Sequence, residues 1–215
     1  RVCLVEETDW LGGQLTAQGV AALDEHDYIE TFGGTASYCR LRNAIRDRYR
    51  PLAGAAGREP EFNPGTCWVT RLAFEPKTAL AALDAMLRPH QDAQRLRVVL
   101  RTKAFAASVE SDRVTSVSTL NIDSGRGIRF RPEIVIDATE FGDLLPLTGT
   151  DYVVWAETIS DTGEPHAQPQ EPKLRCVQSF TYTFAVERRR DGERHVVAMP
   201  DKYEHYRAAQ PFGLT

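Results

Sequence analysis

The chain has 215 residues, of which 42% are hydrophobic and 26% charged, and its formal net charge is −4. This composition is typical of a globular protein with enough apolar side chains for a core, and about 150 residues per domain gives one to two domains. The negative charge argues against a nucleic-acid partner bound by phosphate neutralisation. No apolar run approaches the ~18 residues that a membrane-spanning helix needs, so we expect no such segment.

Residues 2–6 form an apolar run at the start of the chain that ends in two acids, Glu6 and Glu7. The run is typical of a buried parallel strand. Because domains seldom begin inside a buried strand, we expect the chain to be N-terminally truncated. A targeting segment would be missing with the rest, so localisation stays open, with the cytoplasm favoured.

A glycine turn at Gly12 and Gly13 follows, and residues 15–35 are predicted to form a long functional loop. Residues 36–50 are predicted to be a helix, because four apolar side chains recur on one face. A stripe of Arg42, Arg46 and Arg50 runs beside that face, and we interpret it as a solvated surface. The apolar side chains of the helix are Tyr38, Leu41, Ile45 and Tyr49.

A second helix is predicted from Pro76, since proline is favoured at the first helical position. Its apolar residues have the helical period, and Pro89 is expected to end it. Four β-rich pieces come next, at residues 97–102, 103–109, 114–120 and 128–131, and they predict an inserted β-meander.

Residues 134–136 are another apolar run, which ends at Asp137 and predicts a second buried parallel strand. Residues 151–176 are polar. Over residues 176–187 the residues alternate in character, as on the two faces of a strand, and this alternation predicts a long strand. This order of elements predicts an α/β nucleotide-binding layer.

Four cysteines are scattered along the chain without a C-x-x-C pair, so neither a zinc site nor a dithiol motif is predicted, and no metal is expected. We expect them to be buried thiols in a reducing compartment.

In dinucleotide-binding folds an acid at the end of the second strand binds the ribose, and Glu6 has that position after residues 2–6. The alternative is a solvated acid at a strand end. No G-x-G-x-x-G occurs in the sequence, but Gly12 and Gly13 follow Glu6 and favour the ribose interpretation.

Three separated motifs identify a family. They are Glu6 with Gly12-Gly13-Gln14-Leu15-Thr16, then Asn63-Pro64-Gly65-Thr66-Cys67-Trp68-Val69, then Asp137-Ala138-Thr139-Glu140-Phe141-Gly142-Asp143. With them the sequence resembles the FAD-dependent oxidoreductases of the glutathione-reductase-like fold. The resemblance implies a three-layer, Rossmann-like FAD/NAD(P)-binding sheet with an inserted β-meander, plus part of a β-rich substrate domain. It divides the chain into an incomplete FAD-binding domain at residues 1–150, with an insertion at 15–94, and the start of a second domain at 151–215.

The same resemblance implies roles for individual residues. Glu6 would bind the adenosine ribose, and the backbone near Ala104 would face the adenine. Gly12 and Gly13 would approach the diphosphate and ribityl chain, with Gln14 and Thr16 nearby. The turn of Asp137, Ala138 and Thr139 would pack against the cofactor, although Glu140 stands where the wider family has glycine.

The implied first strand lies between residues 2–6 and 134–137 of such a sheet. We therefore expect residues 1–215 alone neither to hold FAD nor to be active.

His26 is the candidate catalytic residue, since the loop that carries it is implied to lie near the reactive flavin ring, where a histidine can act as a general base. A solvated loop histidine is the alternative. Trp68 is interpreted either as part of a substrate pocket or as a buried aromatic residue closing a turn.

The leading interpretation is an FAD-dependent oxidoreductase whose flavin takes a hydride or electrons from an unidentified small molecule. A non-catalytic flavin-fold or saccharide-binding module and a Rossmann methyltransferase are the alternatives. Substrate, electron acceptor and oligomeric state stay open.

Overall fold

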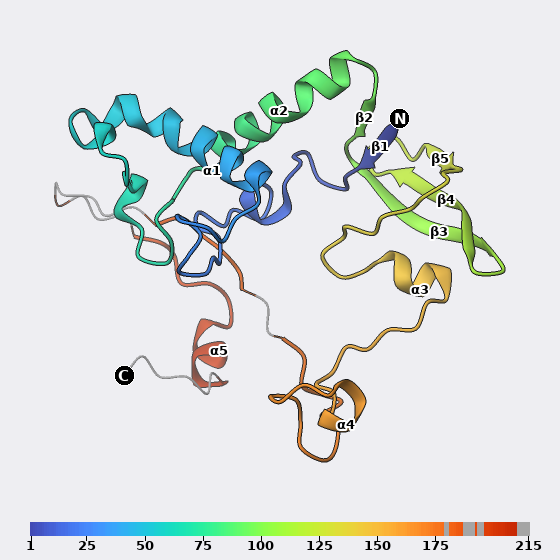
Figure 1. Ribbon diagram of the computed structural model, residues 1–215. Helices are drawn as coiled ribbons and strands as arrows, with labels where there is room; N and C mark the ends of the chain where they lie inside the picture. The colour runs from blue at the N-terminus through green and yellow to red at the C-terminus, as the bar shows by residue number, and fades with distance from the viewer. Residues whose placement is uncertain (179–180, 187–191, 193–195, 210–215) are drawn as a thin grey trace. The chain divides into compact units, whose positions relative to one another are not determined.

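The structure is a computed structural model that describes residues 1–178, 181–186, 192 and 196–209 (Figure 1). The chain forms two units, Arg1–Thr183 and Phe184–Thr215. The first unit contains all the β-strands of the described residues, and the second contains the helix α5 (Tyr203–Ala209). In the part of the chain that the structure describes, no helix has the length and apolar character needed to cross a membrane.

Two strands form a parallel pair in the first unit. The strand β1 (Val2–Val5) pairs with β2 (Leu96–Val99), with Val2 opposite Leu96 and Val5 opposite Val99. Figure 1 shows the two strands side by side. The parallel strand predicted at residues 2–6 is confirmed by this pairing, but its predicted burial is wrong, because Val2 and Cys3 are exposed. The assignment of residues 97–102 to the meander is also wrong. Arg101 has φ +54°, a left-handed conformation, and it ends the extended backbone of β2 before the next strand begins.

The β-meander is a separate antiparallel sheet in the order β3 (Thr102–Glu110), β4 (Arg113–Asn121) and β5 (Gly127–Phe130). Ala104 pairs with Thr119 and Ala106 with Ser118, so Phe105 is an inserted residue with no partner in the register. This β-bulge places the backbone groups of Phe105 outside the ladder. The mixed α/β character, with a parallel and an antiparallel sheet, agrees with the predicted fold class, while the three-layer arrangement stays a prediction.

Two other predicted strands are not seen in the described residues. Residues 134–136 are not a strand, and Ile134 and Ile136 are 79% and 82% exposed. Their apolar character alone does not make a strand, because a strand needs a neighbouring strand for its backbone hydrogen bonds. The predicted strand at 176–187 is likewise absent from its described residues, while 179, 180 and 187 lie outside them.

Beyond residue 150 the described residues carry two isolated β-bridges and the helices α4 (Ile159–Thr162) and α5, but no strand. The predicted β-rich character of this region is therefore not seen there. Another short helix, α3 (Leu144–Thr148), follows the segment that contains Asp137.

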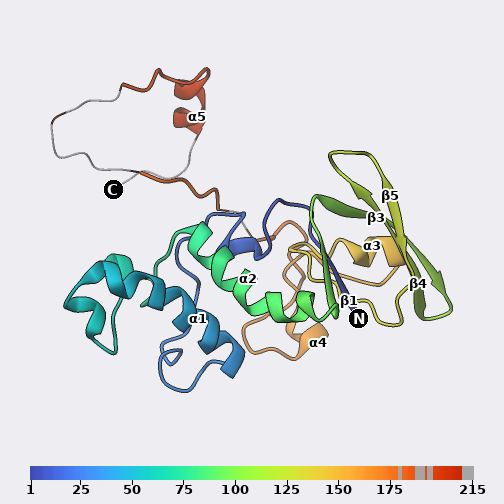
Figure 2. The ribbon, with the colours of Figure 1, turned by 90° about the horizontal axis from the view of Figure 1, so that it is seen from above.

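The core lies between the two long helices, α1 (Ala36–Tyr49) and α2 (Pro76–Asp92), which lie side by side in Figure 1 and Figure 2. Thr35 begins α1, because its side chain accepts a hydrogen bond from the Tyr38 amide. Both predicted helices are confirmed, and the face predicted for α1 is the buried one. The buried core residues are Leu23, Leu41, Ile45, Leu72, Phe74, Ala79 and Ala82.

The end predicted for the second helix is wrong, since α2 continues through Pro89 to Asp92. Proline cannot donate a hydrogen bond, but its carbonyl accepts one from the Ala93 amide at 3.2 Å. That bond closes the last turn of the helix, and Ala93 is its C-cap. The loop between α1 and α2 contains 3₁₀ turns at Arg50–Ala53, Ala56–Arg58 and Pro64–Thr66, and another 3₁₀ turn, Gly13–Leu15, precedes α1.

The Tyr49 hydroxyl joins the end of α1 to the start of α2. It accepts a hydrogen bond from the Glu75 amide at 2.8 Å and donates one to the Thr78 hydroxyl at 3.1 Å. We expect Tyr49→Phe to lower the free energy of unfolding by about 1 kcal/mol, as for a lost hydrogen bond. Urea denaturation measures this, with Tyr28→Phe as the control, because Tyr28 is 58% exposed. Equal midpoints for the two variants would contradict the prediction.

Candidate functional site

The end of β1 and the start of β3 lie together. The Glu6 carbonyl accepts a hydrogen bond from the Thr102 amide at 2.9 Å, and Ala104 lies two residues further along β3. The Thr8 amide donates to Oε1 of Glu6 at 2.7 Å and orients the carboxylate. The structure therefore brings Glu6 close to the bulged part of β3 that contains Ala104.

The glycine turn has a backbone that only glycine adopts readily. Gly12 has φ +116° and Gly13 has φ +50°, and a Cβ on Gly12 would lie 2.7 Å from Cδ1 of Leu83. Thr16 is 1% exposed, and its hydroxyl donates to the Leu11 carbonyl at 2.6 Å. The buried Thr16 side chain thus stabilises the turn through this hydrogen bond. Gln14, by contrast, is exposed.

The turn after residues 134–136 is built by the Asp137 carboxylate. Its Oδ1 accepts from the amide and hydroxyl of Thr139 at 3.0 and 2.8 Å, and its Oδ2 accepts from the Leu144 amide at 2.9 Å. Burial alone would raise the pKa of Asp137, but these hydrogen bonds hold that pKa below its ordinary value. Asp137 and Thr139 therefore shape the turn, and Ala138 lies exposed between them.

Two polar contacts connect the segments just described. Gln18 Nε2 donates to Oε1 of Glu140 at 2.7 Å. Lys103 Nζ lies 2.9 Å from Oε2 of Glu7 and 3.3 Å from Oδ2 of Asp143. All the predicted cofactor-binding residues thus lie on three chain segments that contact one another.

His26 is not among them. Its Nδ1 accepts from the Tyr28 amide at 3.1 Å, and its Nε2 lies 3.2 Å from the Gly33 carbonyl. A neutral ring that carries its proton on Nε2 satisfies both contacts. Within the described residues, the hydrogen bonds of His26 stay in its own loop.

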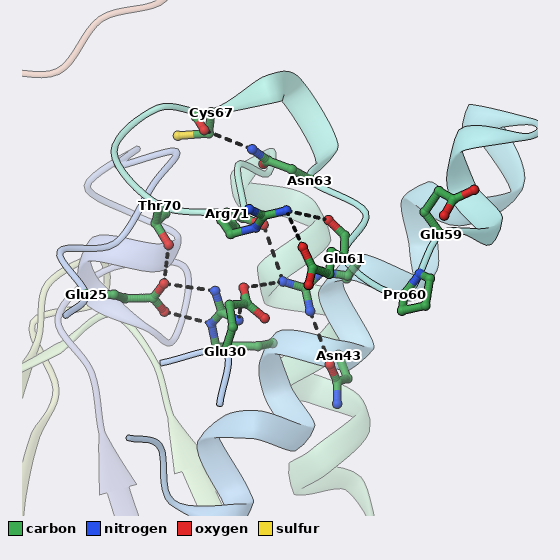
Figure 3. Close-up of polar contacts among 12 residues, drawn as sticks. Glu25, Glu30, Asn43, Glu59, Pro60, Glu61, Asn63, Cys67, Thr70 and Arg71 are labelled. Carbon is green, nitrogen blue, oxygen red and sulfur yellow. Dashed lines mark hydrogen bonds and ion pairs between the residues drawn. The ribbon is translucent and has the colours of Figure 1, made fainter. Parts of the chain in front are cut away.

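The arginine stripe of α1 is not a solvated face, and that prediction is wrong. Arg42 and Arg46 are 3% and 4% exposed, because two acids from the preceding loop lie against them. Nε of Arg42 lies 2.8 Å from Oε1 of Glu25, and Oε1 of Glu30 is 2.8 Å from Nη1 of Arg42 and 2.6 Å from Nη2 of Arg46. We name Glu25, Glu30, Arg42 and Arg46 the charge cluster (Figure 3).

The charge cluster holds the loop between the glycine turn and α1. Glu25 also accepts hydrogen bonds from the hydroxyls of Tyr38 and Thr70, so it joins this loop, α1 and the segment before α2. Burial alone would lower the pKa of Arg42, but Glu25 and Glu30 raise it above its ordinary value. Nε of Arg46 is buried without a hydrogen-bond partner in the described part of the chain. The signal in the sequence was the group of acids at residues 24–30, before the helix.

Trp68 is 93% exposed, so the interpretation of a buried aromatic residue is wrong. All four cysteines are free thiols, and Cys3 and Cys176 are exposed rather than buried. Across residues 1–178, 181–186, 192 and 196–209, no three His, Cys, Asp or Glu side chains are arranged to hold a metal ion.

Comparison with known proteins identifies a family. The model of the family described as "FAD dependent oxidoreductase" matches residues 1–212. No curated protein and no solved structure matches the chain.

Proposed function

The chain belongs to the FAD-dependent oxidoreductase family, whose cofactor is FAD, and from this premise we propose that it oxidises a small-molecule substrate. When bound, FAD accepts a hydride or two electrons. The chain's own residues would hold the cofactor and orient it toward the substrate.

The contacts among the three segments carry this proposal, because they fit an elongated dinucleotide. Glu6 has one carboxylate oxygen oriented by Thr8, and Oε2 has no partner in the described residues, so it suits a ribose hydroxyl. The bulge beside Ala104 offers backbone groups to the adenine. The positive φ of Gly12 and Gly13 forms a turn that only glycine adopts readily, and this turn would present its backbone to the cofactor.

The turn of Asp137, Ala138 and Thr139 supports the same site from the other side. Because the Asp137 carboxylate is engaged in the turn, this segment would offer its backbone rather than a free charge to the cofactor. Gln14 and Thr16 have different parts in the proposal. Gln14 is exposed and can contact the cofactor, whereas Thr16 keeps the glycine turn in shape.

The substrate side of the proposal rests on exposed groups of residues 15–94. Trp68 offers a flat aromatic face to a planar or sugar-like molecule. His26 remains the proposed general base, and its use would require it to exchange a loop hydrogen bond for one to substrate. The division into an FAD-binding domain at 1–150 and a second domain from 151 is part of the same proposal.

Replacement of Glu6 tests the cofactor site. In protein expressed from the complete coding sequence, we expect Glu6→Ala to weaken FAD binding about tenfold to a hundredfold, as for lost hydrogen bonds to a charged group. Binding of FMN should not change, because FMN lacks the adenosine that Glu6 would contact. Titrations followed by flavin fluorescence measure both constants.

The control is Glu110→Ala, which removes an exposed carboxylate from the far end of β3. It should leave both affinities unchanged. A wild-type protein that shows no flavin absorption and takes up no FAD would overturn the proposed function and favour a non-catalytic module.

A further inference from the structure

Glu140 lies against the glycine turn, although the two are far apart in the sequence. A Cβ built on Gly13 would be 3.0 Å from Oε1 of Glu140, so the carboxylate contacts the turn where glycine leaves room. The same oxygen accepts the 2.7 Å hydrogen bond from Gln18. Glu140 follows Thr139 directly, so its side chain spans the space between the two turns of the proposed cofactor site.

Gln18 is itself fixed to the glycine turn. Its amide donates to the Gly13 carbonyl at 3.1 Å, and its carbonyl accepts from the Thr183 hydroxyl at 2.6 Å. The backbone of Gln18 therefore cannot move independently of Gly13. The hydrogen bond from the Gln18 side chain to Glu140 therefore fixes the turn that contains Thr139 relative to the glycine turn.

A second contact holds the same segments at another point. Lys103 lies next to Ala104 and bridges Glu7 and Asp143, while the Asp143 amide donates to the Thr139 hydroxyl at 2.7 Å. Loss of the Gln18–Glu140 contact therefore leaves the segments connected. Since Gln18 and Glu140 are both exposed, their contact contributes little to the stability of the fold. Its effect should appear in the geometry of the site instead.

We propose that Gln18 and Glu140 are positioning residues that set the separation of the Gly12–Gly13 turn and the Asp137–Thr139 turn for FAD. This inference rests on the proposed function, because it assumes that both turns contact the cofactor. The hydrogen bond, rather than the charge of Glu140, performs the positioning, since the oxygen that accepts from Gln18 is the one that contacts the glycine turn.

The test compares four variants of protein expressed from the complete coding sequence. We expect Glu140→Ala and Gln18→Ala each to weaken FAD binding roughly fivefold to tenfold, and the double variant to be no weaker than either single one. Glu140→Gln keeps an oxygen that accepts from Gln18, so it should bind FAD like the wild type. The unfolding midpoint without FAD should be the same for all of them.

Visible circular dichroism of the FAD-saturated proteins reports the environment of the bound flavin. Residues that only stabilise the fold would leave this spectrum unchanged. The bound-flavin spectrum should change in Glu140→Ala and be restored in Glu140→Gln. Glu133→Gln, an exposed residue with the same change of charge, is the control. The inference is overturned if Glu140→Ala binds FAD like the wild type, or if Glu140→Gln is as weak as Glu140→Ala. If Glu6→Ala weakens FAD binding while Glu140→Ala does not, only the inference fails, and if the wild type binds no FAD, the proposed function fails with it.

Discussion

Replacement of Glu25 by alanine should lower the free energy of unfolding by up to about 3–5 kcal/mol, the cost of breaking a buried ion pair, since Arg42 would keep only Glu30, which it shares with Arg46. Arg42 would keep its charge in a site where its side chain is 4% exposed. Glu25 holds Arg42 through two hydrogen bonds, at 2.8 Å to Nε and 2.9 Å to Nη2. It also accepts from Tyr38 and Thr70, which would lose their partner too.

A matched control separates burial from charge. Glu61 pairs with Arg71 at 3.1 Å, but the side chains are 81% and 53% exposed. Glu61→Ala should therefore change stability by less than about 1 kcal/mol. Urea denaturation of the variants measures both effects, and similar losses for Glu25→Ala and Glu61→Ala would show that the charge cluster does not support the fold.

The stabilisation from Glu25 should depend on pH. Burial alone would raise the pKa of Glu25, but hydrogen bonds from Arg42, Thr70 and Tyr38 outweigh it and hold that pKa below its ordinary value. A carboxyl with a depressed folded-state pKa stabilises the fold above its unfolded-state pKa of about 4.3, and this contribution is lost as the pH falls through the folded-state value. The difference in stability between the wild type and Glu25→Gln should therefore be full at neutral pH and shrink in acid.

Replacement of Gly12 by valine is expected to cost about 2–5 kcal/mol and to abolish FAD binding at concentrations that saturate the wild type. Gly12 has φ +116°, where an L side chain is strained, and a Cβ would also lie 2.7 Å from Leu83 and 3.0 Å from the Thr16 hydroxyl. Thr16 is buried and Leu83 packs against the core, so the crowding displaces the turn itself.

Gly149→Ala is the control for backbone strain alone. Gly149 has φ +71° at the end of α3, and nothing lies within 4 Å of the position of its Cβ. This variant should cost about 1 kcal/mol and bind FAD normally. Thermal unfolding and FAD titration measure the two effects, and a Gly12→Val protein that binds FAD like the wild type would contradict the role of the glycine turn.

Local patterns predicted the elements whose stability depends on nearby residues. The spacing of Leu41 and Ile45 gave the buried face of α1, and Pro76 marked the first residue of α2. The β-rich pieces after residue 102 form the meander, with strand ends within a few residues of the prediction. In each case the side-chain period or the fixed φ of proline acts within a few residues of the feature.

The sequence by itself also determined the family, through the motifs around Gly12, Trp68 and Asp137. Only the tertiary structure decided the environment of side chains whose partners come from elsewhere in the chain. Arg42 and Arg46 are buried because Glu25 and Glu30 neutralise them, and Ile134 and Ile136 are exposed because no strand pairs with them in the described residues. The Gln18–Glu140 contact joins residues 122 positions apart, and its physical reason is that folding, rather than sequence spacing, sets which polar groups meet.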